Sequence, residues 1–592
     1  MNRINQLPGG KIIDLILFPV LFGICLILAW FQNFGEKEFP TPPEIYSDKA
    51  DYYVYLPATF IYNWDVNKLP KGIDKVTLGF TLDYEHQKLI VKTTYGVALL
   101  VSPFFLVTHA IAEIGNLKPD GFSDIYQKMT IFPGVFYLVL GLFFLRKFLS
   151  FYFRGALPYI TVLLVFAGTN LYYYALDDCL MSHVYSFFLF STFLFLLKKF
   201  LDSEKKPFGL IIWISLVFSI AVLIRPTNIL LLLWVVFLDV RTWKEAGARL
   251  RLFLKPRYVL ICLAVGFLVF LPQMFYWKYI SGSYMYYSYP GESFSNWKDP
   301  RMIAIWFAPL NGLFLYSPLV MLFVVGMIYM IIRKIPNGYL TAFIFLLISY
   351  LFSSWGSWFF GGSFGYRPFV EYYSLFSLPF AYLLDFLYRK KNKFISSAGI
   401  LLIILMVYYS LMFATHPFWN TSSTWAWDDY LKHAEEAKLY QWPGESYTFK
   451  DDFENNAKRR IFPQEKVVHS PTMAGYMDSD KEYSERISFG LWSILRDKPV
   501  TKVSASLWMN PGQDSLTGAL FCCRIDDWKG NCLFFKALPA DSFVTRPYHW
   551  AKIKGTFFIP EWIDPQYPVF FNIWNIKKKK MFYIDDIVLK FE

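Results

Sequence analysis

Long apolar runs, separated by short charged segments, follow one another along the first 414 residues of the chain. A run of about 20 apolar residues is long enough to cross a bilayer as an α-helix. The pattern therefore predicts a polytopic α-helical membrane protein with about eleven spanning helices. The predicted spans are residues 12–31, 129–148, 156–175, 181–200, 208–224, 227–240, 257–279, 314–332, 339–357, 368–388 and 394–414. We expect the first span to be an uncleaved anchor, because no small-residue cleavage pattern follows it.

The pattern changes after residue 414, where charged residues, Pro, Gly and Asn become frequent. Residues 503–509 and 583–591 alternate between apolar and polar positions, as in strands with one buried face. We therefore expect two domains, a transmembrane domain at 1–414 and a soluble all-β sandwich at 415–592. If the sandwich lies outside the cytosol, Cys522, Cys523 and Cys532 allow one disulfide in it.

Composition and charge fit a membrane protein. Hydrophobic residues make up 55% of the 592 residues and charged residues only 18%, less charge than a soluble protein of this size carries. The net charge of +12 does not indicate nucleic-acid binding, because the cations concentrate in alternate short loops, as the positive-inside rule requires. The rule places the N-terminus in the cytoplasm and the C-terminal domain outside. It also requires that residues 95–114 lie in the outer interface, as one or two helices, without crossing.

The loop at 32–128 then lies outside and carries the first candidate site. Asp48 and Asp51 stand at the start of a stretch, 51–62, that is almost entirely aromatic and aliphatic, and we expect it to form an interfacial helix. A carboxylate at this depth meets the head group of a lipid-borne substrate, and such surroundings can shift its pKa toward that of a general base. Capping of the helix is the alternative role for either Asp.

A second acidic group lies in a predicted outer turn between two spans. Asp177 and Asp178 are adjacent, and His183 follows about one turn later. Carboxylates suit hard divalent cations such as Mg²⁺ or Mn²⁺, although the spacing is not diagnostic of a metal site. Asp177 and Asp178 are candidate metal or substrate ligands, with helix capping as the alternative.

Two arginines are placed to bind phosphate. Arg225 precedes Pro226 at a break in an apolar run, which puts its guanidinium at the outer interface. Arg367 follows the glycine-rich segment 361–365, whose backbone amides can form an anion nest. Guanidinium groups bind phosphate with paired hydrogen bonds. The alternatives are an arginine that only fixes topology and an ordinary glycine-containing loop.

Together these groups favour transfer of a group from a phosphate-linked donor. The cations Lys92, Arg225 and Arg367 would hold the leaving phosphate, and a carboxylate would deprotonate the attacking hydroxyl. The sequence contains no HExxH, paired CxxC, GxGxxG or Walker motif.

Residues 1–414 resemble the GT-C glycosyltransferases, in particular the bacterial relatives of the dolichyl-phosphate-mannose and aminoarabinose transferases. The resemblance rests on these segments: Asp48 and Tyr52 in the first outer loop, Lys92-Thr93-Thr94-Tyr95-Gly96, Met181–Phe188, Arg225-Pro226-Thr227 and the glycine-rich Arg367 loop. It implies that Asp48 is the catalytic residue and that Lys92 contacts the lipid phosphate. In the family a Glu commonly follows the Asp, whereas this chain has Lys49, which leaves open whether Asp51 shares the catalytic role and whether a metal is used.

The resemblance implies an enzyme of the bacterial inner membrane that inverts the anomeric configuration. It would move a sugar from a polyprenyl-phosphate donor to an acceptor hydroxyl on a glycan, lipid or protein, on the extracytoplasmic side. The expected substrate-binding residues are Lys92, Arg225, Arg367, His183 and Tyr52. Residues 445–592 resemble a carbohydrate-binding jelly roll, in which Trp508, Trp528, Trp550, Trp562 and Trp574 stack on sugars or pack in the core.

Two other functions are compatible with the chain. A transporter or flippase of lipid-linked sugars would place charges inside the helix bundle and often has repeated halves, and the sequence suggests neither. A membrane-anchored assembly protein with a glycan-binding tail would need far fewer spans than the chain has.

Overall fold

The computed structural model of the chain describes residues 10–34, 44–289, 291–362, 364–415 and 426–438 of the helical region. In the C-terminal region it describes residues 447–451, 475–477, 482–484, 487–490, 500–513, 517–527, 530–544, 546–560, 562–563, 567–576 and 581–592. The described residues 10–33 and 44–438 form one compact unit, and those from 447 onward form another.

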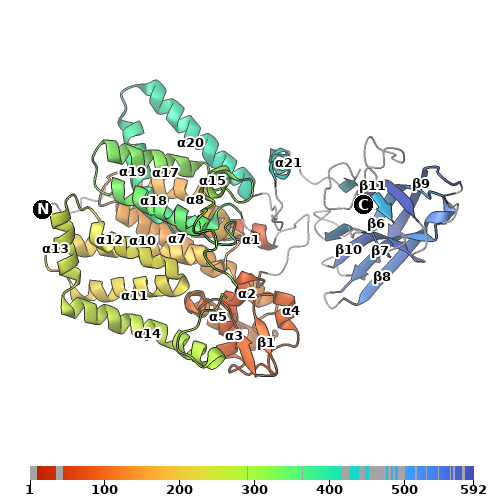
Figure 1. Cartoon of the computed structure of the whole chain (residues 1–592), viewed down its shortest axis with the longest axis horizontal. Helices are drawn as coiled ribbons and strands as arrows, with labels where there is room; N and C mark the ends of the chain where they lie inside the picture. The colour runs from red at the N-terminus through yellow and green to blue at the C-terminus, as the bar shows by residue number, and fades with distance from the viewer. Residues whose placement is uncertain are drawn as a thin grey trace. The chain divides into compact units, whose positions relative to one another are not determined.

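The first unit is helical (Figure 1). It contains α1 Gly10–Phe34, α2 Asp48–Tyr53, α3 Tyr55–Phe60, α4 Ile73–Thr77, α5 Gly96–Ile114, α6 Asp124–Met129, α7 Ile131–Leu149, α8 Leu157–Ala167, α9 Leu171–Leu176, α10 Ser182–Asp202 and α11 Phe208–Ile224. After these come η1 Pro226–Leu230, α12 Leu231–Phe237, α13 Trp243–Phe253, α14 Pro256–Ser281, α15 Met302–Phe307, α16 Leu313–Tyr316, α17 Leu319–Ile332, α18 Gly338–Ser353, η2 Arg367–Phe369, α19 Tyr373–Arg389, α20 Lys393–Ala414 and α21 Trp427–Lys438. A short hairpin, β1 Thr81–Asp83 and β2 Lys88–Ile90, interrupts the series.

The predicted fold class of this region is confirmed, since each of the predicted spans coincides with helix. Among the described residues, six helical stretches are long and apolar enough to cross a membrane, namely α1, α5, α10, α14, α20 and the stretch Asp124–Leu149. Five shorter apolar helices accompany them. The C-terminal helix α21 packs on the same unit, because Tyr430 stacks on Phe413 of α20 with ring centroids 5.5 Å apart.

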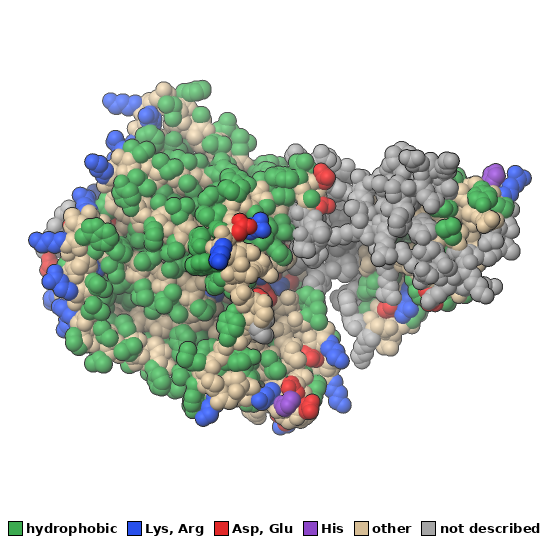
Figure 2. All heavy atoms as spheres, viewed as in Figure 1, with side chains coloured by type: hydrophobic (Ala, Val, Ile, Leu, Met, Phe, Trp, Pro, Cys, Tyr) green, Lys and Arg blue, Asp and Glu red, His purple; other side chains and the backbone are tan. Residues whose placement is uncertain are grey.

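The outer surface of the helical unit is suited to lipid. Figure 2 shows hydrophobic side chains spread across the visible face of this unit, with Lys and Arg gathered at the end that carries α13. Large apolar side chains on α1, α14 and α20 are well exposed, for example Leu15 at 75%, Leu263 at 65% and Tyr408 at 66%. Exposed apolar side chains on long helices are what a bilayer stabilises and water does not.

The two ends of the bundle differ in charge. The end formed by the last turns of α7 and α10 carries Arg146 and Lys147, which pair with Asp14 of α1, and Lys198, which lies 3.0 Å from Asp239. The opposite end holds Asp48, Arg225 and Arg367 and is called the site end below. The cations of the first end are those that the positive-inside rule assigns to the cytoplasm.

The first turns of helix α5 pack at the site end of the bundle. Its residue Leu100 accepts a hydrogen bond from Tyr137, in the second turn of α7, and a Cβ on Gly96 would lie 2.7 Å from Ile224, the last residue of α11. These contacts place the first turns of α5 at the ends of α7 and α11, and the whole of α5 is long and apolar enough to cross a membrane. It is a single helix with Pro103 inside it.

The first turn of α2 is fixed by buried backbone contacts. Ser47, at φ 52°, donates its N–H to the carbonyl of Thr77 at 2.7 Å. Gly79 lies against this turn so closely that a Cβ there would stand 2.3 Å from the Ser47 carbonyl oxygen. Asp51, only 3% exposed, accepts the N–H groups of Lys92 and Thr93 at 2.9 and 2.7 Å. These bonds join α2 to the segment that leads into α5.

The second unit is a sandwich of two antiparallel sheets, as predicted. One sheet has the order β5-β10-β7-β8 and the other β3-β11-β6-β9, with β4 paired to β11. The strands are β3 Tyr447–Asp451, β4 Gly475–Met477, β5 Ile487–Gly490, β6 Lys502–Asn510, β7 Ala519–Asp526, β8 Cys532–Pro539, β9 Ala551–Phe558, β10 Pro568–Asn575 and β11 Phe582–Phe591. The residues that alternate in sequence bury one face, such as Val503, Leu507 and Met509 at 0% exposure.

The disulfide that the sequence allows is not formed, and all six cysteines are free. Cys522 and Cys523 are neighbours on β7 and face opposite sides of the sheet. Cys532 pairs with Asp526 in the register of β8, while Cys522 pairs with Ala537. The thiols are therefore held apart along the same pair of strands.

Asp51 should make stability depend on pH. Burial raises the pKa of Asp51 to about 7 although Lys92 and Thr93 donate hydrogen bonds to it. The native state therefore holds a proton that the unfolded chain releases near its ordinary pKa, so the contribution to stability is full below about pH 4 and is lost as the pH rises through 7. Relative to Asp51→Asn, the free energy of unfolding should fall by up to about 1.4 kcal/mol per pH unit within this window.

Thermal melting of purified wild-type and Asp51→Asn protein between pH 4.5 and 8 measures the effect. Asn accepts only one of the two amide hydrogen bonds, so this variant should also melt lower at acid pH. Melting curves whose pH dependence is the same in both proteins would contradict the assignment.

Candidate active site

Asp48 and Arg367 meet at the site end of the bundle. Asp48 is the first residue of α2, and its carboxylate lies 3.1 Å from a guanidinium nitrogen of Arg367. The Asp48 side chain is 48% exposed and that of Arg367 is 15% exposed. Burial opposes the charge of Arg367, but the Asp48 carboxylate raises the pKa of this guanidinium above its ordinary value. The pair leaves the Asp48 carboxylate nearly half open to solvent.

The glycine-rich loop places Arg367 by close packing. Gly365 has φ 63°, and a Cβ there would stand 2.9 Å from Cβ of Tyr316, so both the conformation and the space require glycine. Phe364 donates its N–H to the hydroxyl of Tyr174 at 3.1 Å, and Asn170 donates to the carbonyl of Phe364 at 3.2 Å. The loop is thereby fixed to α9 and to the residue before it.

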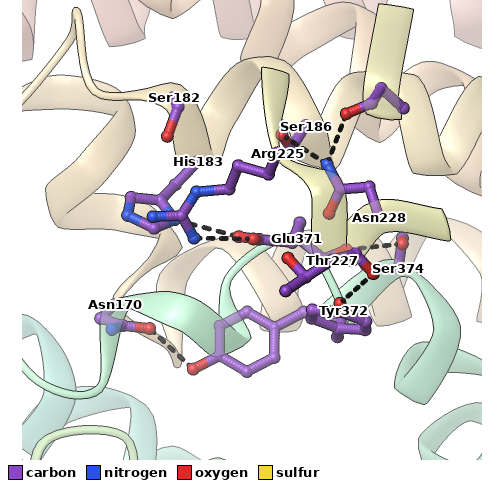
Figure 3. Close-up of polar contacts among 12 residues, drawn as sticks. Asn170, Ser182, His183, Ser186, Arg225, Thr227, Asn228, Glu371, Tyr372 and Ser374 are labelled. Atoms are coloured by element: carbon purple, nitrogen blue, oxygen red, sulfur yellow. Dashed lines mark hydrogen bonds and ion pairs between the residues drawn. The ribbon is translucent and has the colours of Figure 1, made fainter. Parts of the chain in front are cut away.

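Arg225 rests on a buried acid that the sequence analysis did not single out. Its guanidinium lies 3.1 Å from one carboxylate oxygen of Glu371, and the other oxygen lies 3.0 Å from Nδ1 of His183 (Figure 3). Glu371 and His183 are fully buried, while the Arg225 side chain keeps 18% exposure. Burial opposes the charge of Arg225, but Glu371 raises the pKa of the guanidinium. Arg225 therefore remains charged, and its ion pair with Glu371 fixes the orientation of its guanidinium group.

His183 lies deeper than a ligand-contacting residue would. It has no exposed surface, and its ring packs against Tyr174 with centroids 5.0 Å apart. Its contact with Glu371 gives it a supporting position behind Arg225. The loop after α11 is braced in the same region by Asn228, which donates to Ser186 and to the carbonyl of Ala221 (Figure 3).

Tyr52 lies between the charged groups. Its hydroxyl donates to Ser182 Oγ at 3.1 Å. Burial raises the pKa of Tyr52, and Arg225, Asp48 and Arg367 all lie within electrostatic range of it. The phenol therefore remains protonated at neutral pH. Because all three of these charged groups lie near Tyr52, the two arginines and the carboxylate converge on one region although they are far apart in sequence.

Lys92 stands at the edge of this region. Its ammonium pairs with Glu292 and lies 4.6 Å from the ring centroid of Tyr289. Tyr289 is in electrostatic range of Tyr52, Arg225, Asp51 and Asp48, and burial raises its pKa to a value well above neutral. At 43% exposure Lys92 is the most open of the three predicted cations.

Neither aspartate of α2 caps the helix. Ser47 occupies the N-cap without a side-chain hydrogen bond. Asp48 faces Arg367, and Asp51 accepts two amides from the segment before α5. Asp48 thus has the exposure that a general base requires. Asp51 is buried and joins α2 to the segment before α5.

The predicted acidic pair of the outer turn is engaged by the protein itself. Asp178 lies 3.1 Å from the ammonium of Lys49, which also binds Glu44 at 3.0 Å. Tyr173 hydrogen-bonds to Asp177. Within the described part of the chain, no group of three or more His, Cys, Asp or Glu residues is arranged to hold a metal ion. The carboxylates of Asp178 and Glu44 thus already face the ammonium of Lys49, and this arrangement does not fit a divalent cation.

The sequence analysis missed three acids: Glu371 pairs with Arg225, Glu292 pairs with Lys92, and Glu44 pairs with Lys49. Glu371 could have been found, because an acidic residue inside a predicted span marks a functional position. Glu44 and Glu292 gave no such signal, since they lie in polar loops where most acids are solvated.

No protein-family model and no curated protein matches the chain. Among solved structures it is similar to the archaeal oligosaccharyltransferase AglB from Archaeoglobus fulgidus in complex with an inhibitory peptide and a dolichol-phosphate. The TM-score is 0.41 and the identity 12%, over 74% of this chain and 62% of that chain.

Two further structures of the Archaeoglobus fulgidus oligosaccharyltransferase are similar. The apo form gives a TM-score of 0.41 at 12% identity, over 69% of this chain and 57% of that one. The form tethered to an acceptor peptide with the NVT sequon gives 0.39 at 11%, over 67% and 55%. The chain thus spans less than two thirds of each matched chain.

Proposed function

We propose that the chain is an integral-membrane glycosyltransferase that moves a sugar from a polyprenyl-phosphate donor to an acceptor hydroxyl. The observation that carries the proposal is the meeting of the half-exposed Asp48 carboxylate with Arg367, next to Arg225, at one end of an apolar bundle. A lipid phosphate at the membrane surface is an anion that needs such cations. An acceptor hydroxyl needs a base beside them.

The proposed reaction uses the groups in this order. Asp48 takes the proton of the acceptor hydroxyl as its oxygen attacks the anomeric carbon from the side opposite the phosphate. The bond between that carbon and the phosphate oxygen breaks, and the phosphate leaves with the electron pair. Arg367, Arg225 and Lys92 stabilise the charge that develops on it. Attack from the opposite side inverts the anomeric configuration.

The binding of phosphate would also release the base. In the structure Arg367 is paired with Asp48 at 3.1 Å, and a phosphate would compete for the same guanidinium. Arg225 is prepared differently, because Glu371 and His183 hold it from behind. One arginine can thus adjust to the donor while the other keeps its position.

The proposed location follows from charge. Cations at the end of the bundle opposite the site, such as Arg146, Lys147 and Lys198, would lie in the cytoplasm. The site end and the C-terminal sandwich would then lie on the extracytoplasmic side of a bacterial inner membrane. A sugar carried by a polyprenyl lipid is available there without a nucleotide donor.

The buried acid Glu371 is a feature that a transporter or flippase of lipid-linked sugars would also have, since such proteins place charges inside the bundle. A transporter moves the intact lipid-linked sugar and breaks no bond. Formation of free polyprenyl phosphate by the purified protein therefore distinguishes the two functions.

Asp48→Asn should abolish transfer. The amide cannot accept a proton, so the rate with a lipid-linked sugar donor should fall by about 10²–10⁴. The matched control is Asp65→Asn, since Asp65 is an acid of the same loop whose contacts are the exposed Lys68 and the N–H of Asn67, both close in sequence. The assay measures radiolabelled sugar transferred by purified protein in detergent or nanodiscs.

Full activity of Asp48→Asn would remove Asp48 from the mechanism. Equal losses in Asp65→Asn would show that loop charge in general, and not the base at position 48, is being measured.

Glu371→Gln should destabilise the protein and weaken donor binding. Arg225 would lose its buried counter-charge, and such a loss costs about 3–5 kcal/mol. The KM for the donor should rise, because the guanidinium is no longer directed. The control is Asp385→Asn on α19, the helix that follows Glu371, which removes a pair with the exposed Arg389 and should leave melting and KM unchanged.

Melting temperature and donor KM are the two measurements. A Glu371→Gln protein with wild-type values of both would contradict the role given to Glu371.

The C-terminal sandwich offers a place for a glycan. Trp574 of β10 stacks on Tyr483 with centroids 5.7 Å apart and planes at 16°, and Phe535 of β8 meets it edge-on at 6.4 Å. Tyr483 is 49% exposed and Phe535 47% exposed. We propose that these three rings bind the apolar face of a sugar in the acceptor glycan. Trp528 lies outside the described residues, and Trp562, at 70% exposure, is no core residue.

Trp574→Ala in the full-length protein should lose at least about 1 kcal/mol of glycan affinity, measured on a glycan array and by titration. The control is Trp508→Ala, which removes an outward ring of the other sheet that lies 5.8 Å from the ammonium of Lys552. Unchanged binding by Trp574→Ala would exclude this face as the sugar site.

A further inference from the structure

Lys49 places a positive charge where two largely buried acids, Glu44 and Asp178, meet. It follows Asp48 directly in the first turn of α2. Its ammonium lies 3.0 Å from Glu44 and 3.1 Å from Asp178, and the three side chains are only 11%, 8% and 13% exposed. The two carboxylates come from different parts of the chain, one from the segment before α2 and one from the turn before α10.

Two carboxylates withdrawn from water need a counter-charge between them. Without it they repel each other, and one of them must take up a proton. Two kinds of group can supply the charge, a divalent cation with oxygen ligands or an ammonium of the protein. Although burial opposes the charge, Glu44 and Asp178 raise the pKa of Lys49 above its ordinary value. The ammonium is therefore permanent at physiological pH.

The surroundings of Lys49 do not suit an additional metal ion. Mg²⁺ and Mn²⁺ prefer about six oxygen ligands at close range, and here one oxygen of each acid already faces an ammonium. The neighbouring Asp177 is engaged with Tyr173. No group of three or more candidate ligands is assembled in the described chain.

We propose that the Lys49 ammonium takes the place of a divalent cation beside Asp48. It is a positioning residue, which joins the first turn of α2 to the 177–178 turn and so holds Asp48 toward Arg367. The wild-type protein accordingly binds no divalent cation at Glu44 and Asp178, and transfer needs none. The role in transfer rests on the proposed function, whereas the metal-binding behaviour does not.

Lys49→Gln tests the inference by a gain of binding. Glutamine is uncharged and of similar reach, so Glu44 and Asp178 would face each other with no cation between them. Mn²⁺ should then bind about tenfold or more tightly than to wild type, measured by electron paramagnetic resonance of free Mn²⁺ with full-length protein in detergent. The melting temperature should rise by about 2 °C or more on addition of 1 mM Mn²⁺.

Two variants serve as controls. Lys49→Arg keeps the charge and should gain no Mn²⁺ binding. Lys68→Gln makes the same change of charge at an exposed pair with Asp65, where side-chain exposures are 64% and 37%, and should also gain none. The double variant Lys49→Gln with Asp178→Asn should lose the Mn²⁺ binding that Lys49→Gln acquires.

Three results would overturn the inference. They are tight Mn²⁺ binding by wild type that Asp178→Asn abolishes, loss of wild-type transfer on chelation, and folded Lys49→Gln that gains no Mn²⁺ binding. If Lys49→Gln fails to fold, recovery of folding in the double variant supports the ion pair, and failure of that variant too opposes it. The Mn²⁺ measurements need no sugar donor, so they decide the inference even if no transfer is found.

Discussion

Charge that is withdrawn from water must be neutralised close by, and this constraint organises the site end of the protein. Asp48 with Arg367, Arg225 with Glu371, and Lys49 with Asp178 are all ion pairs between residues distant in sequence. Each pair joins separate segments, because the low dielectric of a lipid-facing bundle makes an unpaired charge costly. The pairs therefore determine where the loop at 44–95 can lie on the bundle.

The pairs differ in how available they are to a ligand, and this difference gives them their roles. Glu371 and His183 have no exposed surface and can only support what lies in front of them. Asp48 and Lys92 are nearly half exposed and can meet a substrate. Arg225 and Arg367 lie between these extremes, with guanidinium groups that are held by acids and open at one side. A graded arrangement of this kind is preorganised for an anion.

Much of the fold follows from the sequence, because the spans and the strands each have a pattern with a fixed period. The convergence of Asp48 with Arg225 and Arg367 could also be predicted, since the topology puts their loops on one side of the membrane. What could not be predicted is the partner of each charge. Glu44 and Glu292 resemble any solvated acid in a loop, and the amides that Asp51 accepts lie about 40 residues away in the chain.

The central claim is that the cations at the site end bind a lipid-linked phosphate. The most direct measurement is the affinity of the purified protein in nanodiscs for a polyprenyl monophosphate, compared between wild type and Arg225→Gln with Arg367→Gln. The account predicts saturable binding by wild type and a loss of affinity of about tenfold or more in the double variant. Equal affinity in both proteins would contradict it.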